Sequence, residues 1–217
     1  MRHLFLLLAF LAAPALAETV RLSPNGVNAT LSFDERLAAH PAFDAFLRED
    51  AIAFAEDAGF DGARAFALED RATRVDAGYA SVLRRSETDY GGALPAVFVE
   101  ALVWSGAAAD FARLDAFFDD GPSQDEALIA ISRHLRETIR KRVWGGRIAP
   151  AFEPLVSQAT NPDAAVLSNF TLEPNGAVAF HYSPKEVAPL DRGAISILVP
   201  RDVFAAWLNR EGRAAMR

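Results

Sequence analysis

The sequence contains no cysteine, which excludes disulfide bonds, thiolate metal sites and a lipid-modified cysteine at the N-terminus. Histidine is also scarce, and its four copies stand far apart at His3, His40, His134 and His181. None of them has the His-x-x-x-His or His-Glu spacing that places two metal ligands on one helix face. We therefore expect no metal site and no cofactor.

Long apolar runs are missing beyond the first residues of the chain. The run from Leu4 to Ala13 holds about ten residues, roughly half the length that spans a bilayer. Arg2 precedes this run and Ala15-Leu16-Ala17 follows it, which is the pattern of a secretory signal with a small-residue cleavage site. The sequence thus predicts a signal peptide over residues 1–17, cleavage after Ala17, no membrane anchor after cleavage, and a periplasmic or secreted protein.

Sequence motifs typical of enzyme active sites are absent as well. The chain has no Gly-x-Ser-x-Gly elbow and no glycine-rich phosphate loop. Asp119-Asp120 and Asp125-Glu126 lack the spacing of a calcium-binding hand, and acids at a helix start offset the helix dipole. His181 and Glu186 are one candidate pair of a base and its orienting partner, and the alternative is a plain, hydrogen-bonded histidine. We expect a non-enzymatic protein.

Acidic residues outnumber basic ones, with 29 Asp and Glu against 22 Lys and Arg. Cleavage after Ala17 removes Arg2, which leaves 21 basic and 29 acidic residues and a net charge of −8. This balance argues against nucleic acid as a partner and favours the approach of basic proteins. The local exception is an arginine stripe, Arg133, Arg136 and Arg140, on one helix face. The stripe is either a carboxylate-binding surface or a solvated face.

The N-terminal third predicts a hairpin followed by a helix. Thr19–Leu22 and Val27–Phe33 flank Pro24-Asn25-Gly26, and the second arm alternates apolar and polar residues. Pro41 suits the first position of a helix that ends at Gly59. We expect its apolar stripe to lie on the sheet as core; the stripe consists of Phe43, Phe46, Leu47, Phe54 and Ala58.

The middle of the chain predicts an antiparallel strand pair and a second helix. Residues 72–88 suit one long, twisted strand or two strands, and a turn at residues 89–95 leads into an antiparallel partner at residues 96–104. Ser123 and Glu126 form a capping box that starts a helix reaching to about Val143, whereas residues 147–165 form an irregular connection. One face of that helix is apolar at Leu128, Ile131, Leu135 and Ile139.

The stretch from Asn169 to Pro200 predicts a small antiparallel unit. Residues 167–172 and 177–182 pair as a hairpin around Pro174-Asn175-Gly176, and residues 194–199 form a third strand. The connecting loop from Ser183 to Gly193 contains two prolines, which make it extended and stiff.

These residues resemble the domain of unknown function shared by the extracytoplasmic parts of the RsiV anti-sigma factor and the PdaC peptidoglycan deacetylase. The resemblance covers residues from about 79 to 203 and, more loosely, the N-terminal hairpin and helix. Lys185 and Leu190 stand where that family usually has tyrosine, and Leu94 stands where it has histidine. The residues that carry the resemblance are Phe170, Leu172, Phe180, Pro184, Glu186, Val187, Ala188, Pro189, Gly193, Val199 and Pro200.

The resemblance implies two kinds of ligand, a lysozyme-like basic protein or peptidoglycan, and electrostatics slightly favours the first. We expect ligand contacts from Tyr90 and from residues of the second hairpin and its loop: His181, Tyr182, Lys185 and Glu186. The arginine stripe is the other candidate surface. The alternative is a cell-wall glycan hydrolase or a deacetylase-associated protein that uses carboxylates, with Glu173 and Glu186 as a candidate pair.

The elements together predict an α+β fold with antiparallel sheets and two main helices packed on them. We expect a hairpin-helix region over residues 18–68 and a C-terminal α+β domain over residues 69–217. Because no flexible linker separates them, the alternative is one continuous unit.

Overall fold

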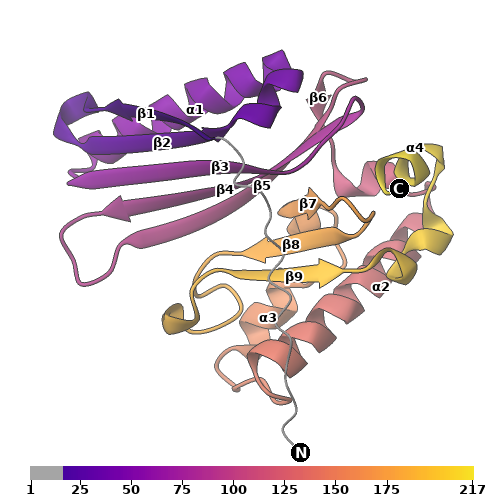
Figure 1. Cartoon of the computed structure of the whole chain (residues 1–217). Coiled ribbons are helices and arrows are strands. Elements are labelled where there is room, and N and C mark those ends of the chain that lie inside the picture. The colour runs from indigo at the N-terminus through magenta and orange to yellow at the C-terminus, as the bar shows by residue number, and fades with distance from the viewer. Residues whose placement is uncertain (1–16) are drawn as a thin grey trace, which may run out of the picture.

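The structure is a computed structural model that describes residues 17–217. The predicted signal peptide lies outside the described residues except for Ala17, where the first strand begins. None of the helices in the described part of the chain has the length and apolar character needed to cross a membrane. The predicted α+β class is confirmed, with two sheets and helices packed on them (Figure 1).

A six-stranded sheet forms the larger half of the molecule, with its strands in sequence order. All neighbouring strands are antiparallel except β2 and β3, which are parallel because helix α1 (Pro41–Phe60) crosses between them. The predicted first hairpin is part of it. Residues 72–88 follow the two-strand alternative, since β3 ends at Val75 and β4 begins at Tyr79, and only β4 pairs with residues 96–105. Its strands are β1 (Ala17–Leu22), β2 (Asn28–Asp34), β3 (Ala65–Val75), β4 (Tyr79–Asp89), β5 (Ala96–Ser105) and β6 (Asp110–Phe111).

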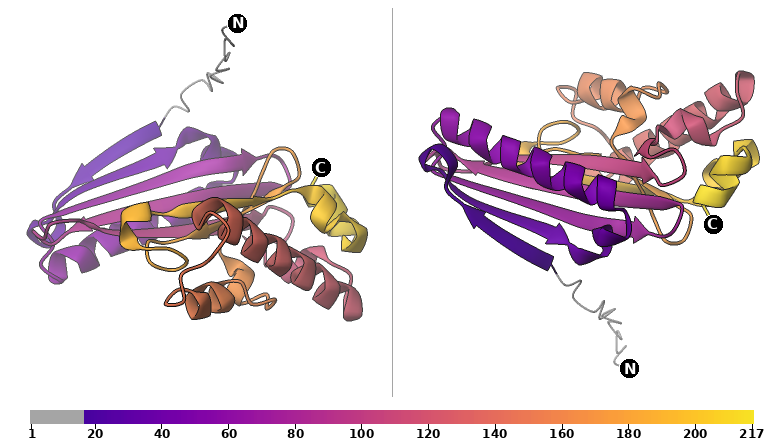
Figure 2. Two further views of the ribbon diagram at one scale, coloured as in Figure 1. Left: turned by 90° about the horizontal axis from the view of Figure 1, so that it is seen from below. Right: turned by 90° about the horizontal axis from the view of Figure 1, so that it is seen from above.

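Helix α1 lies on one face of this sheet, as the view from above in Figure 2 shows. Its buried residues are Phe43, Leu47, Ala51, Ala55 and Ala58, a ridge with a spacing of about four. The predicted stripe is therefore partly wrong, because Phe46 and Phe54 are 39% and 42% exposed. The alanines of the ridge let the helix approach the sheet closely, whereas the rings of Phe46 and Phe54 are turned outward.

A buried ion pair lies under α1. Arg84 of β4 donates Nε and Nη2 to the carboxylate of Asp70 on β3 at 2.7 and 2.8 Å. Its guanidinium also donates to the Leu47 carbonyl at 2.9 Å and to the Asp50 carboxylate, both of α1. The arginine thus ties the helix to the sheet.

The smaller sheet consists of β7 (Phe170–Leu172), β8 (Val178–Tyr182) and β9 (Ile195–Val199), all antiparallel. This confirms the hairpin and third strand predicted for the second half of the chain. Helices α2 (Pro122–Thr138), α3 (Glu153–Ala159) and α4 (Arg210–Ala215) belong to this part of the molecule. Leu128, Ile131, Leu135 and Ile139 all lie in the core shared with this sheet, as predicted.

Two local predictions in this half are wrong. Gly121, at φ 75°, caps α2, and Pro122 is its first residue, so Ser123 lies inside the helix and caps nothing. Glu126 instead accepts a hydrogen bond from Trp207 Nε1 at 2.8 Å. The stretch 147–165 is not irregular throughout, because it contains α3, which has Pro154 in its first turn, where a proline is tolerated.

Hydrogen bonds join the two sheets. The outer edge of β7 meets β3 and β4, where Thr73 Oγ1 donates to the Leu172 carbonyl at 2.9 Å and Leu172 N–H donates to Ser81 Oγ at 2.8 Å. The predicted boundary at residue 68 falls within β3, which pairs with β2 on one side and β4 on the other. The six-stranded sheet is therefore continuous across that position.

Side chains from the smaller half also pair with the outer edge of β5. Asn169 Oδ1 accepts from Ala101 N–H at 2.5 Å, and Asn169 Nδ2 donates to the carbonyls of Val99 at 3.2 Å and His181 at 2.8 Å. Ser183 Oγ accepts from Val99 N–H at 3.0 Å. These side chains satisfy backbone groups that an exposed edge strand would otherwise leave free.

Candidate functional site

Strand β8 places the neighbours His181 and Tyr182 on opposite faces of the smaller sheet, because side chains alternate along a strand. Tyr182 belongs to the apolar face with Phe180 and Val178, which packs in the core with α2. His181 lies on the other face, together with Thr171 and Ser196 from the two neighbouring strands. The two candidate residues His181 and Tyr182 therefore lie in different environments.

His181 is the centre of a buried hydrogen-bond chain. Thr171 Oγ1 donates to Glu173 Oε1 at 2.9 Å, so it accepts from His181 Nε2–H at 2.8 Å. Nδ1 then accepts from the Ser196 hydroxyl, also at 2.8 Å. Burial, with a smaller contribution from Arg71, lowers the pKa of His181 from 6.5 to about 4. The imidazole is therefore neutral at pH 7 and is held by Thr171 and Ser196 rather than by Glu186.

A cavity of about 390 Å³ lies on the apolar side of β8, and we call it the Tyr182 pocket. The Ser183–Gly193 loop borders it through Glu186. Its walls are mostly apolar, and the polar groups are few; the lining residues are Leu155, Gln158, Ala159, Val166, Leu167, Asn169, Phe180, His181, Tyr182 and Glu186. A pocket of this size and lining is typical of sites for small ligands or polymer segments.

Two polar groups in the Tyr182 pocket are notable. The Tyr182 side chain is 5% exposed, and its hydroxyl has no hydrogen-bond partner within residues 17–217. Burial and then the charge of Glu186 raise the pKa of Tyr182, so the hydroxyl keeps its proton. Loss of hydration also raises the pKa of Glu186. A buried hydroxyl without a partner costs free energy, and a ligand acceptor would recover it if the pocket wall moved enough to expose the oxygen.

The loop beside the pocket is tightly folded. Ser183 N–H donates to Glu186 Oε2 at 3.0 Å, and Glu186 N–H donates to the Ser183 carbonyl at 3.2 Å. Between them the exposed Lys185 has φ 76°, a left-handed conformation that non-glycine residues rarely adopt. Further along, Trp144 Nε1 donates to the Val187 carbonyl at 3.0 Å. The loop is thus anchored at both sides of Lys185.

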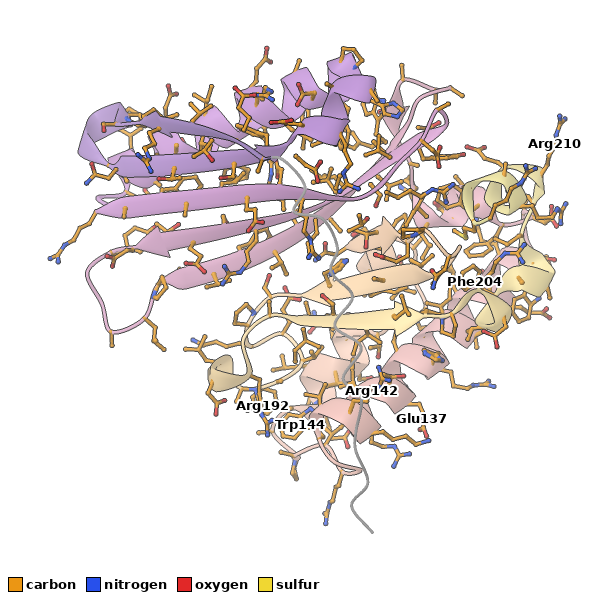
Figure 3. All side chains as sticks on the ribbon, in the orientation of Figure 1. Glu137, Arg142, Trp144, Arg192, Phe204 and Arg210 are labelled. Carbon is orange, nitrogen blue, oxygen red and sulfur yellow. The ribbon has the colours of Figure 1, made fainter. Side chains whose placement is uncertain are left out.

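The three arginines of the stripe line one groove of about 380 Å³, which we call the arginine groove, together with Ile129, Ser132, Glu137 and Pro162. Arg140 donates to both oxygens of Glu137, at 2.9 and 3.3 Å, and Arg136 Nε donates to Thr160 Oγ1 at 3.3 Å. Arg133 makes no hydrogen bond or ion pair with another described residue. Figure 3 shows Glu137 near the C-terminal end of α2. Arg133 and Arg136 are therefore the two arginines of the groove that no carboxylate within residues 17–217 neutralises.

The Tyr182 pocket and the arginine groove flank the C-terminal end of α3. Gln158 and Ala159 line the first, while Thr160 contacts the second through its bond with Arg136. Ser132 Oγ also donates to the Thr160 carbonyl. The turn that ends α3 thus separates two concave surfaces, one largely apolar and one basic.

The remaining candidates lie apart from these surfaces. Tyr90 is 51% exposed in the turn between β4 and β5, which projects from the end of the six-stranded sheet (Figure 1), and it lines none of the three cavities of about 430, 390 and 380 Å³. Glu173 and Glu186 lie beyond opposite ends of β8, and none of these three cavities is lined by both. No group of three or more histidine or acidic side chains within residues 17–217 is placed to hold a metal ion.

Sequence reasoning missed the wall that α3 contributes to the Tyr182 pocket. Leu155, Gln158 and Ala159 fell in a stretch predicted to be irregular because of its prolines. The missed signal was Glu153-Pro154, an acid and a proline at positions typical of a first helical turn.

Residues 115–202 match the family model described as "Protein of unknown function (DUF3298)". The matched range contains α2, α3 and the smaller sheet, and therefore both concave surfaces. No curated protein matches the chain at a significant level.

Two solved structures share the fold over nearly the whole chain. A DUF3298 family protein from Pseudomonas aeruginosa PAO1 has 14% sequence identity and a TM-score of 0.61, covering 92% of this chain and 96% of its own. A DUF3298 family member from Bacteroides fragilis NCTC 9343 has 12% identity and a TM-score of 0.60, covering 93% and 95%. At these identities the likeness concerns the fold alone.

Proposed function

We propose that this protein is an exported, non-enzymatic binding module of the cell envelope, related to the extracytoplasmic domains of RsiV and PdaC. The observation that carries the proposal is the Tyr182 pocket, which the Ser183–Gly193 loop borders and whose wall includes Tyr182 with its unpartnered, buried hydroxyl. A binding role requires a concave surface such as the Tyr182 pocket beside this loop.

The ligand that fits this geometry best is a peptidoglycan fragment. Such a fragment combines amide and hydroxyl groups with free carboxylates on its peptide. The Tyr182 hydroxyl and Gln158 would pair with its amide groups, and Arg133 and Arg136 would hold a carboxylate. Concave surfaces of 390 and 380 Å³ suit segments of a polymer better than the broad, flat patch of a protein interface.

The second candidate ligand is a lysozyme-like basic protein. Its support is the net charge of −8 that the chain carries after the predicted cleavage, which steers a basic protein toward it. Such steering increases the association rate and weakens as salt is added. Salt dependence therefore separates the two candidates.

Isothermal titration calorimetry tests both, with soluble peptidoglycan fragments in one arm and hen lysozyme in the other. We expect the fragments to bind, Tyr182→Phe to weaken binding about fivefold to tenfold, and Arg133→Ala with Arg136→Ala to weaken it further. Arg142→Ala is the matched control, because Arg142 is an exposed arginine just beyond α2 that does not line the arginine groove.

The arms have distinct outcomes. If only lysozyme binds, and if that binding is lost at high salt and unaffected by Tyr182→Phe, the ligand is a basic protein and not peptidoglycan. If neither ligand binds, the proposed function is overturned.

A further inference from the structure

Strand β5 carries a row of partly exposed side chains on one of its faces. Phe98, Glu100 and Leu102 form this row, because residues two apart along a strand share a face. Phe98 is 53% exposed, whereas Glu100 and Leu102 are half-buried. Phe111 of β6 is 39% exposed and extends the row, since its ring packs edge to face on Trp104, the next residue of this face, at 5.5 Å between centroids. One carboxylate therefore lies between two accessible phenyl rings.

This row borders a cavity of about 430 Å³, which we call the Glu100 cavity. It is distinct from the Tyr182 pocket and shares only Asn169 with it. Its other walls come from residues 111–114 and from the segment 164–170. Most of the lining is apolar, and the polar lining residues are Glu100, Arg113, Ser168 and Asn169. A cavity of this volume and composition is typical of a site for a small molecule.

Glu100 sets the charge of this cavity. Arg113 also lines it, but its guanidinium is paired with the Asp115 carboxylate at 2.9 Å. Glu100 makes no hydrogen bond or ion pair with another residue in the described part of the chain. A half-buried carboxylate without a partner loses hydration and gains nothing in return, which is unfavourable. The cavity therefore presents an uncompensated negative charge to its occupant.

The arginine opposite Glu100 does not provide that compensation. Arg84 pairs across from Glu100 on β4, yet its guanidinium donates to Asp70 at 2.7 and 2.8 Å. Its remaining bonds go to the Asp50 carboxylate and the Leu47 carbonyl. Burial raises the pKa of Glu100; the charge of Arg84 opposes this, and the carboxylates of Asp50 and Asp70 add to it. A cation in the cavity would favour the charged carboxylate and lower that pKa again.

The phenyl rings on either side of Glu100 favour an organic cation. An ammonium group is attracted to the face of an aromatic ring, and it donates charge-assisted hydrogen bonds to a carboxylate. An aliphatic stem fits against Leu102 and the apolar walls at Ala164 and Ala165. A metal ion fits less well, because no group of three or more histidine or acidic side chains within residues 17–217 is placed to hold one.

We propose that the Glu100 cavity binds a small primary amine with an aliphatic stem. The ammonium group donates to the Glu100 carboxylate beside the rings of Phe98 and Phe111, and the stem lies against the apolar walls. The Ser168 hydroxyl, which makes no hydrogen bond with another described residue, is a further acceptor on the cavity wall. This site is independent of the ligand proposed for the Tyr182 pocket.

The test is a titration of ¹⁵N-labelled protein with hexylamine, which is a cation at neutral pH, observed by NMR. We expect saturable shifts of the amides of Glu100, Leu102 and Ala165 at roughly millimolar amine. Hexanol has the same stem without the charge, and we expect it to bind at the same amides about tenfold more weakly.

Protein variants separate the charge from the shape of the cavity. We expect Glu100→Gln to weaken hexylamine binding about fivefold to tenfold and to leave hexanol binding unchanged, which shows that the cavity is intact. Phe98→Ala should weaken hexylamine binding about twofold to fivefold. The matched control is Glu69→Gln, because Glu69 is an exposed carboxylate on β3 that does not line the cavity.

Three results would overturn the proposal. The first is the absence of saturable shifts around Glu100. The second is equal binding of hexylamine and hexanol, or full hexylamine binding by Glu100→Gln, since either would show that the carboxylate does not select a cation. The third is tighter binding of N-acetyl-lysine methylamide than of hexylamine, which would assign the site to a lysine side chain of a partner protein.

Discussion

Replacing Asn169 with alanine tests how the two halves of the molecule are joined. The asparagine side chain makes three hydrogen bonds, to Ala101 N–H and to the carbonyls of Val99 and His181. Alanine removes all of them and leaves the Ala101 N–H without a partner, in a residue that is 8% exposed. The perturbation therefore combines lost hydrogen bonds with the desolvation of at least one orphaned donor.

The expected cost is about 2–4 kcal/mol of unfolding free energy. A neutral hydrogen bond contributes roughly 0.5–1.5 kcal/mol net, and a buried group left unsatisfied costs roughly 1–3 kcal/mol. We discount the sum because Ser183 Oγ also lies 3.5 Å from the Val99 carbonyl and partly replaces the lost donor. For a chain of this size, the melting temperature should fall by roughly 5–15 °C.

Urea denaturation monitored by tryptophan fluorescence measures the cost, with thermal unfolding as a second readout. Asn161→Ala is the matched control, because the Asn161 side chain is exposed and makes no hydrogen bond with another described residue. We expect that control to stay within about 0.5 kcal/mol of the wild type. An equally small change for Asn169→Ala would refute the conclusion that this side chain ties the smaller half to β5.

Three further predictions concern single side chains. His181 has a pKa of about 4 in the folded protein, below its unfolded value, so the unfolded chain binds more protons between pH 4 and 6.5. The free energy of unfolding should therefore fall as the pH drops from about 6.5 to 4, by up to about 1.4 kcal/mol per pH unit. In His181→Gln, the urea midpoint should depend less on pH. Arg84→Ala leaves the buried Asp70 carboxylate unpaired and should cost about 3–5 kcal/mol in chemical denaturation, and a cost below about 1 kcal/mol would contradict the role of the ion pair. Lys185→Gly relieves a left-handed backbone and should raise stability by up to about 1 kcal/mol, whereas a loss would show that the lysine side chain holds the loop.

Local patterns were sufficient to predict much of the fold. The hairpin around Pro174-Asn175-Gly176 followed from turn residues and alternation, both of which act over a few positions. Helix α1 followed from Pro41 and the spacing of its apolar residues. Which side of α1 is buried did not follow, because the small Ala51 and Ala55, rather than Phe46 and Phe54, decide how closely the helix approaches the sheet.

The candidate site was less accessible to sequence reasoning. The arginine stripe was predictable because residues three and four apart share a helix face. The Tyr182 pocket was not, because its walls come from α3, β8 and the loop after β8, which only tertiary packing brings together. The contacts of Asn169 and Ser183 with β5 join residues about 70 and 84 positions apart, and no local pattern indicates them.

The most direct test of the central claim is the mapping of amide chemical shifts while soluble peptidoglycan fragments are added to the ¹⁵N-labelled protein. The binding-module proposal predicts saturable shifts clustered at Leu155–Ala159 and Tyr182–Glu186, with further shifts at Arg133 and Arg136. Saturable shifts confined to other surfaces, or no shifts at millimolar fragment, would contradict it.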